Sequence, residues 1–360
     1  MATDASNAAV QVLKEGEVQG SDVVAHSAGI LDIKTNILPN ADALFLTAID
    51  PYGHELWRWT FPVNKLNQQT EQLSPLSSRP TYTETENDLT VKANKRTFIF
   101  SKKDGQLKGV SVDNRKISFA NGPRFIGARR ADRSLDQFYN HDDEKAKEKD
   151  RTYSEFPDAA VFTKLDVKQD GGDLIVTANY KLGNLDKAQW TINPSGDLAL
   201  DYTYNFSGVV DLMGIRFDYP EDQVISKRWL GAGPYRVWQN RIHGTQYDIW
   251  ENDYNDPIPG ETFTYPEFKG YFGNVSWMNI QTKEGTISLT NETPDTYIGV
   301  YQPRDGRDRL LYTLPESGIS VLNVIPPVRN KVNSTDLCGP SSQPKWVNGP
   351  QTGRVIFRFM

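Results

Sequence analysis

Apolar and polar residues alternate with a period of two through most of the chain. The clearest case is the segment 198–206, in which Leu, Leu, Tyr, Tyr and Phe alternate with Ala, Asp, Thr and Asn. This period places the apolar side chains on one face of a strand. Helical periodicity is scarce, and strands do not alternate with helices. The pattern therefore predicts an all-β protein.

Further segments have the same signature. Residues 97–100 and 107–112 flank a Lys-Asp-Gly-Gln turn, which is typical of a β-hairpin. Residues 174–182 follow a turn at 169–173, which contains two glycines. We expect later strands at 275–281, 286–290, 297–301, 320–325 and 354–359. Before residue 64 we expect four strands, at 9–14, 29–35, 43–50 and 56–63.

Two polar segments interrupt this rhythm. Residues 64–80 end in Ser and Pro and are typical of a linker. We therefore divide the chain into a first domain at 1–63, a linker at 64–82 and a second domain at 83–360. An immunoglobulin-like sandwich needs about seven strands and ~100 residues, so we expect the first domain to be either a partial sandwich, cut at its N-terminus, or an unusually small one.

The second polar segment, 140–150, carries charges of both signs and indicates a solvated loop or a short helix. Its stretch His141-Asp142-Asp143-Glu144 has carboxylates that suit Ca²⁺ or Mg²⁺, but it lacks the spacing of an EF-hand. We assign no metal site and no cofactor.

Composition narrows the class of protein. The chain has 360 residues, a net charge of −6 and no large block of one sign, which argues against a duplex nucleic-acid binder. No apolar run approaches 18 residues, so we expect no membrane span. The N-terminus has no recognisable signal peptide, which leaves the cytoplasm and the periplasm open. Cys338 is the single cysteine, so it forms no internal disulfide, and we expect a buried or idle thiol.

Several segments, in a conserved order along the chain, match one family. They are residues 94–96 (Asn-Lys-Arg), 228–234 (Arg-Trp-Leu-Gly-Ala-Gly-Pro), 264–270 (Thr-Tyr-Pro-Glu-Phe-Lys-Gly) and 320–324 (Ser-Val-Leu-Asn-Val). Together they resemble the C-terminal module of family 2 β-galactosidases. Residues 50–61 resemble the last hairpin of the immunoglobulin-like domain that precedes this module.

The resemblance implies a partial immunoglobulin-like sandwich followed by a large antiparallel β-supersandwich, galactose mutarotase-like in fold. It also implies that the chain is the tail of a longer glycoside hydrolase that releases terminal β-galactosides. Such hydrolysis needs two carboxyl groups about 5 Å apart, which the family mounts on a separate (β/α)₈ barrel. The chain has one Asn-Glu pair, Asn291-Glu292, and its sequence context predicts a strand end that enters a turn.

We therefore assign no catalytic residue and expect the chain alone to be inactive. The missing barrel would be supplied in cis or by a partner subunit.

A sugar site needs aromatic faces and hydrogen-bonding groups together. These gather in the stretch 235–253, and a further tryptophan follows near the C-terminus. We assign carbohydrate contacts, with a galactoside-like ligand, to Tyr235, Trp238, Arg241, His243, Trp250 and Trp346. The alternative is that these aromatic residues fill the core, as we expect for Trp277, which lies in a strand-like segment.

One residue departs from the family pattern. Where lactose-cleaving members send a tryptophan into the active site, this chain has Val321. Trp346 is then the candidate replacement for stacking on the sugar, and lactose is in doubt as the substrate.

Two other functions stay open. In a mutarotase-like epimerase, His243 would act as the acid with Glu251 or Glu267 as the base. In the other, the chain is a carbohydrate-binding protein without catalysis.

Overall fold

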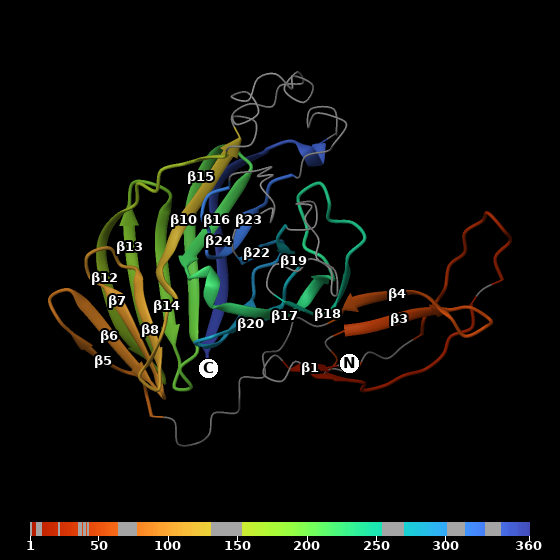
Figure 1. Ribbon diagram of the computed structural model, residues 1–360, viewed down its shortest axis with the longest axis horizontal. Helices are drawn as coiled ribbons and strands as arrows, with labels where there is room; N and C mark the ends of the chain where they lie inside the picture. Colours follow the sequence, from red (N-terminus) through yellow and green to blue (C-terminus); the bar gives the residue numbers. More distant parts are fainter. Residues whose placement is uncertain are drawn as a thin grey trace. The chain divides into compact units, whose positions relative to one another are not determined.

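The structure is a computed structural model that describes residues 2–4, 9–20, 22–34, 38, 41, 43–63, 78–130, 153–253, 270–300, 314–327 and 340–360. The chain divides into two compact units, residues 1–72 and 73–360. In the described part, helical structure is limited to two 3-10 turns, η2 (Glu221–Gln223) and η5 (Pro340–Ser342). The prediction of an all-β protein is confirmed (Figure 1).

The first unit holds two antiparallel pairs. Strand β1 (Ala2–Asp4) pairs with β2 (Ala9–Gln11), and β3 (Ala43–Ile49) pairs with β4 (Glu55–Pro62). The strand expected at 29–35 is wrong for residues 29–34, which the structure describes as non-strand chain. Its Ile30 is 92% exposed, so the apolar residues of this segment do not form the buried face of a strand.

The larger unit contains two sheets. Within the described residues the first has eleven strands, in the order β19-β22-β23-β16-β10-β8-β7-β6-β5, with β11 paired to β10 and β9 to β8. Its strands are β5 (Thr81–Glu84), β6 (Asp88–Ala93), β7 (Arg96–Ser101), β8 (Leu107–Val112), β9 (Arg115–Ile117), β10 (Ala120–Arg130), β11 (Tyr153–Glu155), β16 (Leu212–Asp218), β19 (Phe272–Gly273), β22 (Tyr297–Val300) and β23 (Ile319–Val324). The expected hairpin is the pair β7–β8. Strand β5 begins at Thr81, inside the segment that we assigned to the linker.

The second sheet has nine strands in the described part, in the order β12-β13-β14-β15-β24-β21-β20-β17-β18. Its strands are β12 (Val161–Asp170), β13 (Asp173–Lys181), β14 (Leu185–Ile192), β15 (Leu198–Val210), β17 (Val224–Gly233), β18 (Gln246–Asp253), β20 (Trp277–Thr282), β21 (Gly285–Asn291) and β24 (Lys345–Phe359). Neighbouring strands in the described part of this sheet are antiparallel. The longest pairing joins β15 to β24 along thirteen residue pairs, from Leu198↔Phe357 to Val210↔Lys345.

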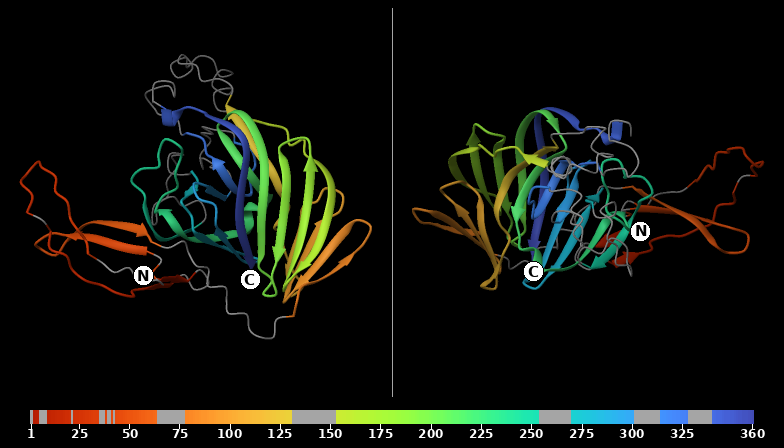
Figure 2. Two further views of the ribbon diagram at one scale, coloured as in Figure 1. Left: turned by 180° about the vertical axis from the view of Figure 1, so that it is seen from behind. Right: turned by 45° about the horizontal axis from the view of Figure 1, so that its top comes forward.

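The two sheets pack face to face around one aromatic-rich core. Figure 2 shows the yellow-green strands of the nine-stranded sheet next to the orange strands of the other. Between them, the ring of Phe119 lies 4.7 Å from that of Phe217 and 5.0 Å from that of Phe357. Trp190 is fully buried in the same cluster. The large antiparallel sandwich is therefore confirmed.

A second core covers the opposite face of the eleven-stranded sheet. On β10, Phe125 belongs to the core between the sheets, whereas the next residue, Ile126, belongs to the second core. On β23, Val321 faces inward and Leu322 outward in the same way. The residues that complete the second core include Trp238, from the connection between β17 and β18. The period of two thus builds two cores on one sheet.

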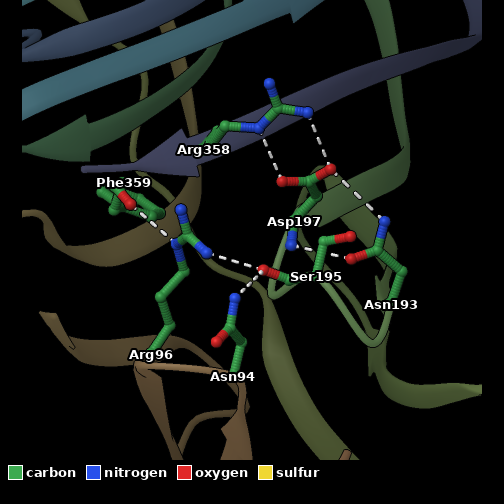
Figure 3. Close-up of polar contacts among 7 residues, drawn as sticks. All are labelled: Asn94, Arg96, Asn193, Ser195, Asp197, Arg358 and Phe359. Carbon is green, nitrogen blue, oxygen red and sulfur yellow. Dashed lines mark hydrogen bonds and ion pairs between the residues drawn. The ribbon is translucent and has the colours of Figure 1, made fainter. Parts of the chain in front are cut away.

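Polar contacts fasten the two sheets at one end, and we call this group the sheet clamp (Figure 3): Asn94, Arg96, Asn193, Ser195, Asp197 and Arg358. Arg96 of β7 donates to the carbonyls of Phe359 (2.7 Å) and Ser195 (2.6 Å). Arg358 of β24 donates to both oxygens of Asp197, at 2.7 and 2.9 Å. The clamp links β7 of one sheet to β24 and the β14–β15 turn of the other.

Candidate functional site

The connection between β17 and β18, residues 234–245, carries most of the predicted sugar-contacting residues. It is tied to a distant part of the chain. The side-chain amide of Gln239 donates to the carbonyls of Ser341 (2.8 Å) and Gln343 (2.7 Å), and Asn240 donates to Ser342 Oγ (3.2 Å). These bonds hold the connection against the segment that leads directly into Trp346. Residues about a hundred positions apart are therefore brought into one region. We call this region, residues 234–245 together with 341–346, the loop site.

Three predicted residues of the loop site lie in solvent. Arg241 and His243 are exposed, and the Trp346 side chain is 72% exposed at the start of β24. Tyr235 is half-buried and donates its hydroxyl hydrogen to the carbonyl of Gly244 (2.9 Å), which braces the loop. The exposed indole has a face on which a sugar could stack, and the exposed guanidinium and imidazole groups have hydrogen-bond donors.

The other two predicted residues serve the fold. Trp238 is 1% exposed, and its ring packs edge-on to Tyr271 at 5.8 Å, so it has no open face for a ligand. It fills the second core, as the alternative predicted, and it leaves our set of contact residues. Trp250 is half-buried against the main core, and its Nε1 donates to the carbonyls of Gly231 and Gln246, both at 3.2 Å. Trp277 is 1% exposed, as expected of a core residue.

Asn291 and Glu292 are bound into the structure. Asn291 ends β21, and its amide donates to Thr296 Oγ1 at 2.8 Å. The Glu292 carboxylate lies 2.9 Å from Nε of Arg354. The pair thus forms a strand end and a turn, as its sequence context predicted.

The structure describes two of the three residues that we considered for a mutarotase-like acid–base pair, His243 and Glu251. His243 is exposed, while the carboxylate of Glu251 faces Arg228 at 3.8 Å. Glu267, Cys338 and the stretch from His141 to Glu144 lie outside the described residues. In the part of the chain that is described, no group of three or more His, Cys, Asp and Glu could hold a metal ion. That part also contains no helix with the length and apolarity needed to cross a bilayer.

Sequence reasoning missed a polar cleft of about 570 Å³ near the end of β16. Its walls come from several separate segments and contain donors, acceptors and small apolar surfaces. They are Lys108, Lys116, Ser118, Ala120, Asn121, Asp218, Tyr219, Pro220, Glu221, Glu316, Ser317 and Gly318. No motif marks this set, because the chain segments meet only when β8, β10 and β16 pair and the 316–318 turn packs beside them.

Hydrogen bonds hold the polar groups of the cleft in place. The Asp218 carboxylate accepts from Asn121 Nδ2 at 2.9 Å and is bound by Arg124. Lys108 Nζ lies 2.9 and 3.1 Å from the two oxygens of Asp88. Burial raises the pKa of Tyr219, so its hydroxyl stays protonated and donates to Glu284 at 3.1 Å.

Comparison with known proteins agrees with the resemblance inferred from the sequence. The family described as β-galactosidase small chain matches residues 92–325. No curated protein sequence matches the chain.

Among solved structures, galactose 1-epimerase from Lactobacillus acidophilus is 10% identical, with a TM-score of 0.46 over 79% of this chain and 99% of that one. The GalM/aldose epimerase homologue from C. elegans is 6% identical, with a TM-score of 0.37 over 78% and 99%. A copper-containing benzylamine oxidase from Hansenula polymorpha is also 6% identical, with a TM-score of 0.31 over 78% and 60%. These low scores carry no argument about function, whereas the family match spans well over half of the sequence. The chain belongs to the β-galactosidase small chain family.

Proposed function

We propose that this chain is the non-catalytic, carbohydrate-contacting module of a family 2 glycoside hydrolase that releases terminal β-galactosides. The observation that carries the proposal is the loop site. There, Arg241 and His243 lie in solvent on a connection that is bonded to the segment leading into the exposed Trp346. In a module of this family, such an exposed aromatic surface suits contact with a sugar held at the edge of a catalytic domain.

The proposal requires the reacting carboxylates to come from elsewhere. The Asn-Glu pair of this chain is engaged in the fold, since Glu292 pairs with Arg354. A (β/α)₈ barrel, in cis or on a partner subunit, would supply the acid/base and the nucleophile. The module would then wall the cleft and position the sugar without a bond-making role.

The first test is turnover of o-nitrophenyl β-galactoside. We expect none from this chain alone, and turnover once a barrel-bearing β-galactosidase chain that lacks this module is added. Hydrolysis by the purified chain alone would contradict the proposal. Anomer interconversion of galactose by the chain alone, lost in His243→Ala, would instead support the epimerase.

The second test addresses the loop site in the assembled enzyme. Trp346→Ala should raise KM about three- to tenfold with little change in kcat, because loss of a stacking face weakens sugar binding by about 0.5–1.5 kcal/mol. Tyr82→Ala is the matched control, since Tyr82 is also an exposed aromatic residue, 46% exposed on β5. An equal effect of both substitutions would argue against sugar contact at Trp346.

A further inference from the structure

The polar cleft lies far from the loop site. Trp346 pairs with Val209, near the end of β15, and β16 starts three residues later at Leu212. The cleft residue Asp218 is at the other end of β16, six residues on. At about 3.3 Å per residue, the two sites are separated by roughly 20 Å along the strand. In Figure 1, β24 likewise runs from η5 at the top of the view to the C-terminus at the bottom. A single disaccharide is too short to span both sites.

The charges around the cleft nearly cancel. Lys108 and Lys116 line it together with Asp218, Glu221 and Glu316. Of these, Lys108 is already paired with Asp88, and Asp218 with Arg124. A phosphate needs a surplus of positive charge, which these walls do not offer, and within the described residues no group of three or more His, Cys, Asp and Glu could hold a metal ion. A neutral ligand has no such requirement.

The hydrogen-bonding groups of the cleft are of mixed kind, and the carboxylate of Asp218 is held in a fixed orientation. Asn121 and Arg124 hold the Asp218 carboxylate in place, yet a carboxylate has about four lone-pair sites and can accept further bonds. Lysine ammonium groups donate, and Ser118 and Asn121 lie in the same walls. Each hydroxyl of a sugar both donates and accepts, so it can use donors and acceptors side by side. Ala120 and Pro220 add small apolar surfaces for its C–H groups.

The backbone shapes one wall of the cleft. Gly318 has a φ of +50°, and a Cβ there would lie 2.1 Å from the carbonyl oxygen of Phe217. A side chain at this position would push segment 316–318 away from β16, with which Gly318 forms a bridge at Phe217. The absence of a side chain therefore keeps this segment beside β16, where Glu316 and Ser317 line the cleft together with Asp218. A volume of about 570 Å³ is within the range of small-molecule sites.

We propose that this cleft is a second binding site for neutral sugars, separate from the loop site. The Asp218 carboxylate accepts hydrogen bonds from sugar hydroxyls, and Asn121 and Glu316 complete the contacts. The inference goes beyond the proposed function, because it follows from the chemistry of the cleft and does not depend on a catalytic partner.

The test is calorimetric titration of the full chain with lactose and, separately, with maltose, in a Trp346→Ala background that removes stacking at the loop site. We expect saturable binding of at least one of the two sugars. Asp218→Ala should weaken it about tenfold or more, the loss typical of a hydrogen bond to a charged group. Asp166→Ala is the matched control. Asp166 is an exposed carboxylate paired with Lys164 on β12, and its loss should leave the affinity unchanged.

A second variant guards against misfolding of Asp218→Ala, which also leaves Arg124 without its carboxylate. Glu316 is exposed, and only its main-chain carbonyl is hydrogen-bonded, to Arg216. Glu316→Ala should therefore keep the fold and still weaken binding severalfold. The Trp346→Ala chain is titrated with each sugar up to roughly 50 mM, the weakest affinity of interest. If neither sugar shows saturable binding in this range, the proposal is overturned. Unchanged affinity in both Asp218→Ala and Glu316→Ala would also overturn it.

Discussion

At the residue scale, polar side chains of this protein mostly hold the fold together. Asn94 and Arg96, which carry part of the family resemblance, lie in the sheet clamp and bind the carbonyl of Ser195 from across the sandwich (Figure 3). Asp197 is 8% exposed and is the carboxylate of this group. The Asn-Lys-Arg motif is therefore explained by sheet-to-sheet attachment and not by contact with a ligand.

The clamp should make stability depend on pH. Burial alone raises the pKa of Asp197, but the hydrogen bond and charge of Arg358, with help from Asn193 and Arg96, outweigh it and lower the pKa below its ordinary value. Since the folded-state pKa is lowered, the stabilisation is fully present above about pH 4 and is lost as the pH falls through the folded-state pKa. Asp197→Asn should cost about 2–4 kcal/mol at pH 7. Urea unfolding at pH 7 and at pH 3 measures this cost.

The difference between wild type and Asp197→Asn should shrink at the lower pH, because the wild-type carboxyl then begins to take up its proton. Asp166→Ala is the control, since its ion pair with Lys164 is exposed and should contribute less than about 1 kcal/mol. A difference that grows on acidification would contradict the assignment.

At the scale of elements, β24 organises the nine-stranded sheet. It pairs with β15 along thirteen residues and with β21 near the C-terminus. Only its last part, 354–359, was predicted, because Gly349, Pro350 and Gly353 break the apolar alternation before it. These residues have a low intrinsic preference for strands, but pairing with β15 stabilises the extended backbone here. The strand therefore continues through them.

Two glycines with positive φ differ in how closely other atoms approach them. Gly196, in the β14–β15 turn, has a φ of +81°, and a Cβ would lie 2.8 Å from the Ala93 carbonyl oxygen. Gly349, in β24, has a φ of +91° with nothing within 4 Å. Gly349→Ala should cost about 1–2 kcal/mol for the backbone conformation alone. Gly196→Ala should cost about 3 kcal/mol or more, because it also displaces the clamp. Denaturant unfolding of both variants makes the comparison, and equal costs would argue against the close approach.

At the scale of the whole molecule, the chain divides into two compact units. Both cores described here, and all residues of the sheet clamp, belong to the unit 73–360. The first unit contributes two hairpin-like pairs, and its strand β4 leaves Trp57, Trp59 and Phe61 between 43% and 47% exposed. The described residues of both cores therefore come from the larger unit alone.

This separation predicts the result of a truncation. A chain of residues 78–360 should fold on its own. Its free energy of unfolding in urea should lie within about 0.5 kcal/mol of that of the same transition in the full chain, because all described residues of both cores are retained. Phe119→Ala is the comparison within this truncated chain, since it deletes a fully buried ring and should cost about 3–5 kcal/mol. Failure of the truncated chain to fold would show that the smaller unit stabilises the sandwich.

The sequence by itself determined the all-β class, the family and nearly half of the strands described in the large unit, among them β7, β8, β13, β15 and β20 to β23. The alternation of apolar and polar residues in a strand such as β15 arises because one face of the strand is buried. This pattern can be recognised within a few consecutive residues. The prediction of a strand at 29–34 was wrong because it used this local pattern alone, and the structure describes these residues as non-strand chain. Reliance on local sequence also explains why Trp238 and Trp346 looked alike in sequence, although one is buried and the other 72% exposed. Three features depend on residues about a hundred positions apart in the sequence. They are the burial of these tryptophans, the binding of the Gln239 loop to residues 341–343, and the meeting of Asn121, Asp218 and Glu316 in one cleft. Only the pairing of distant strands brings such residues together, so only the tertiary structure could decide them.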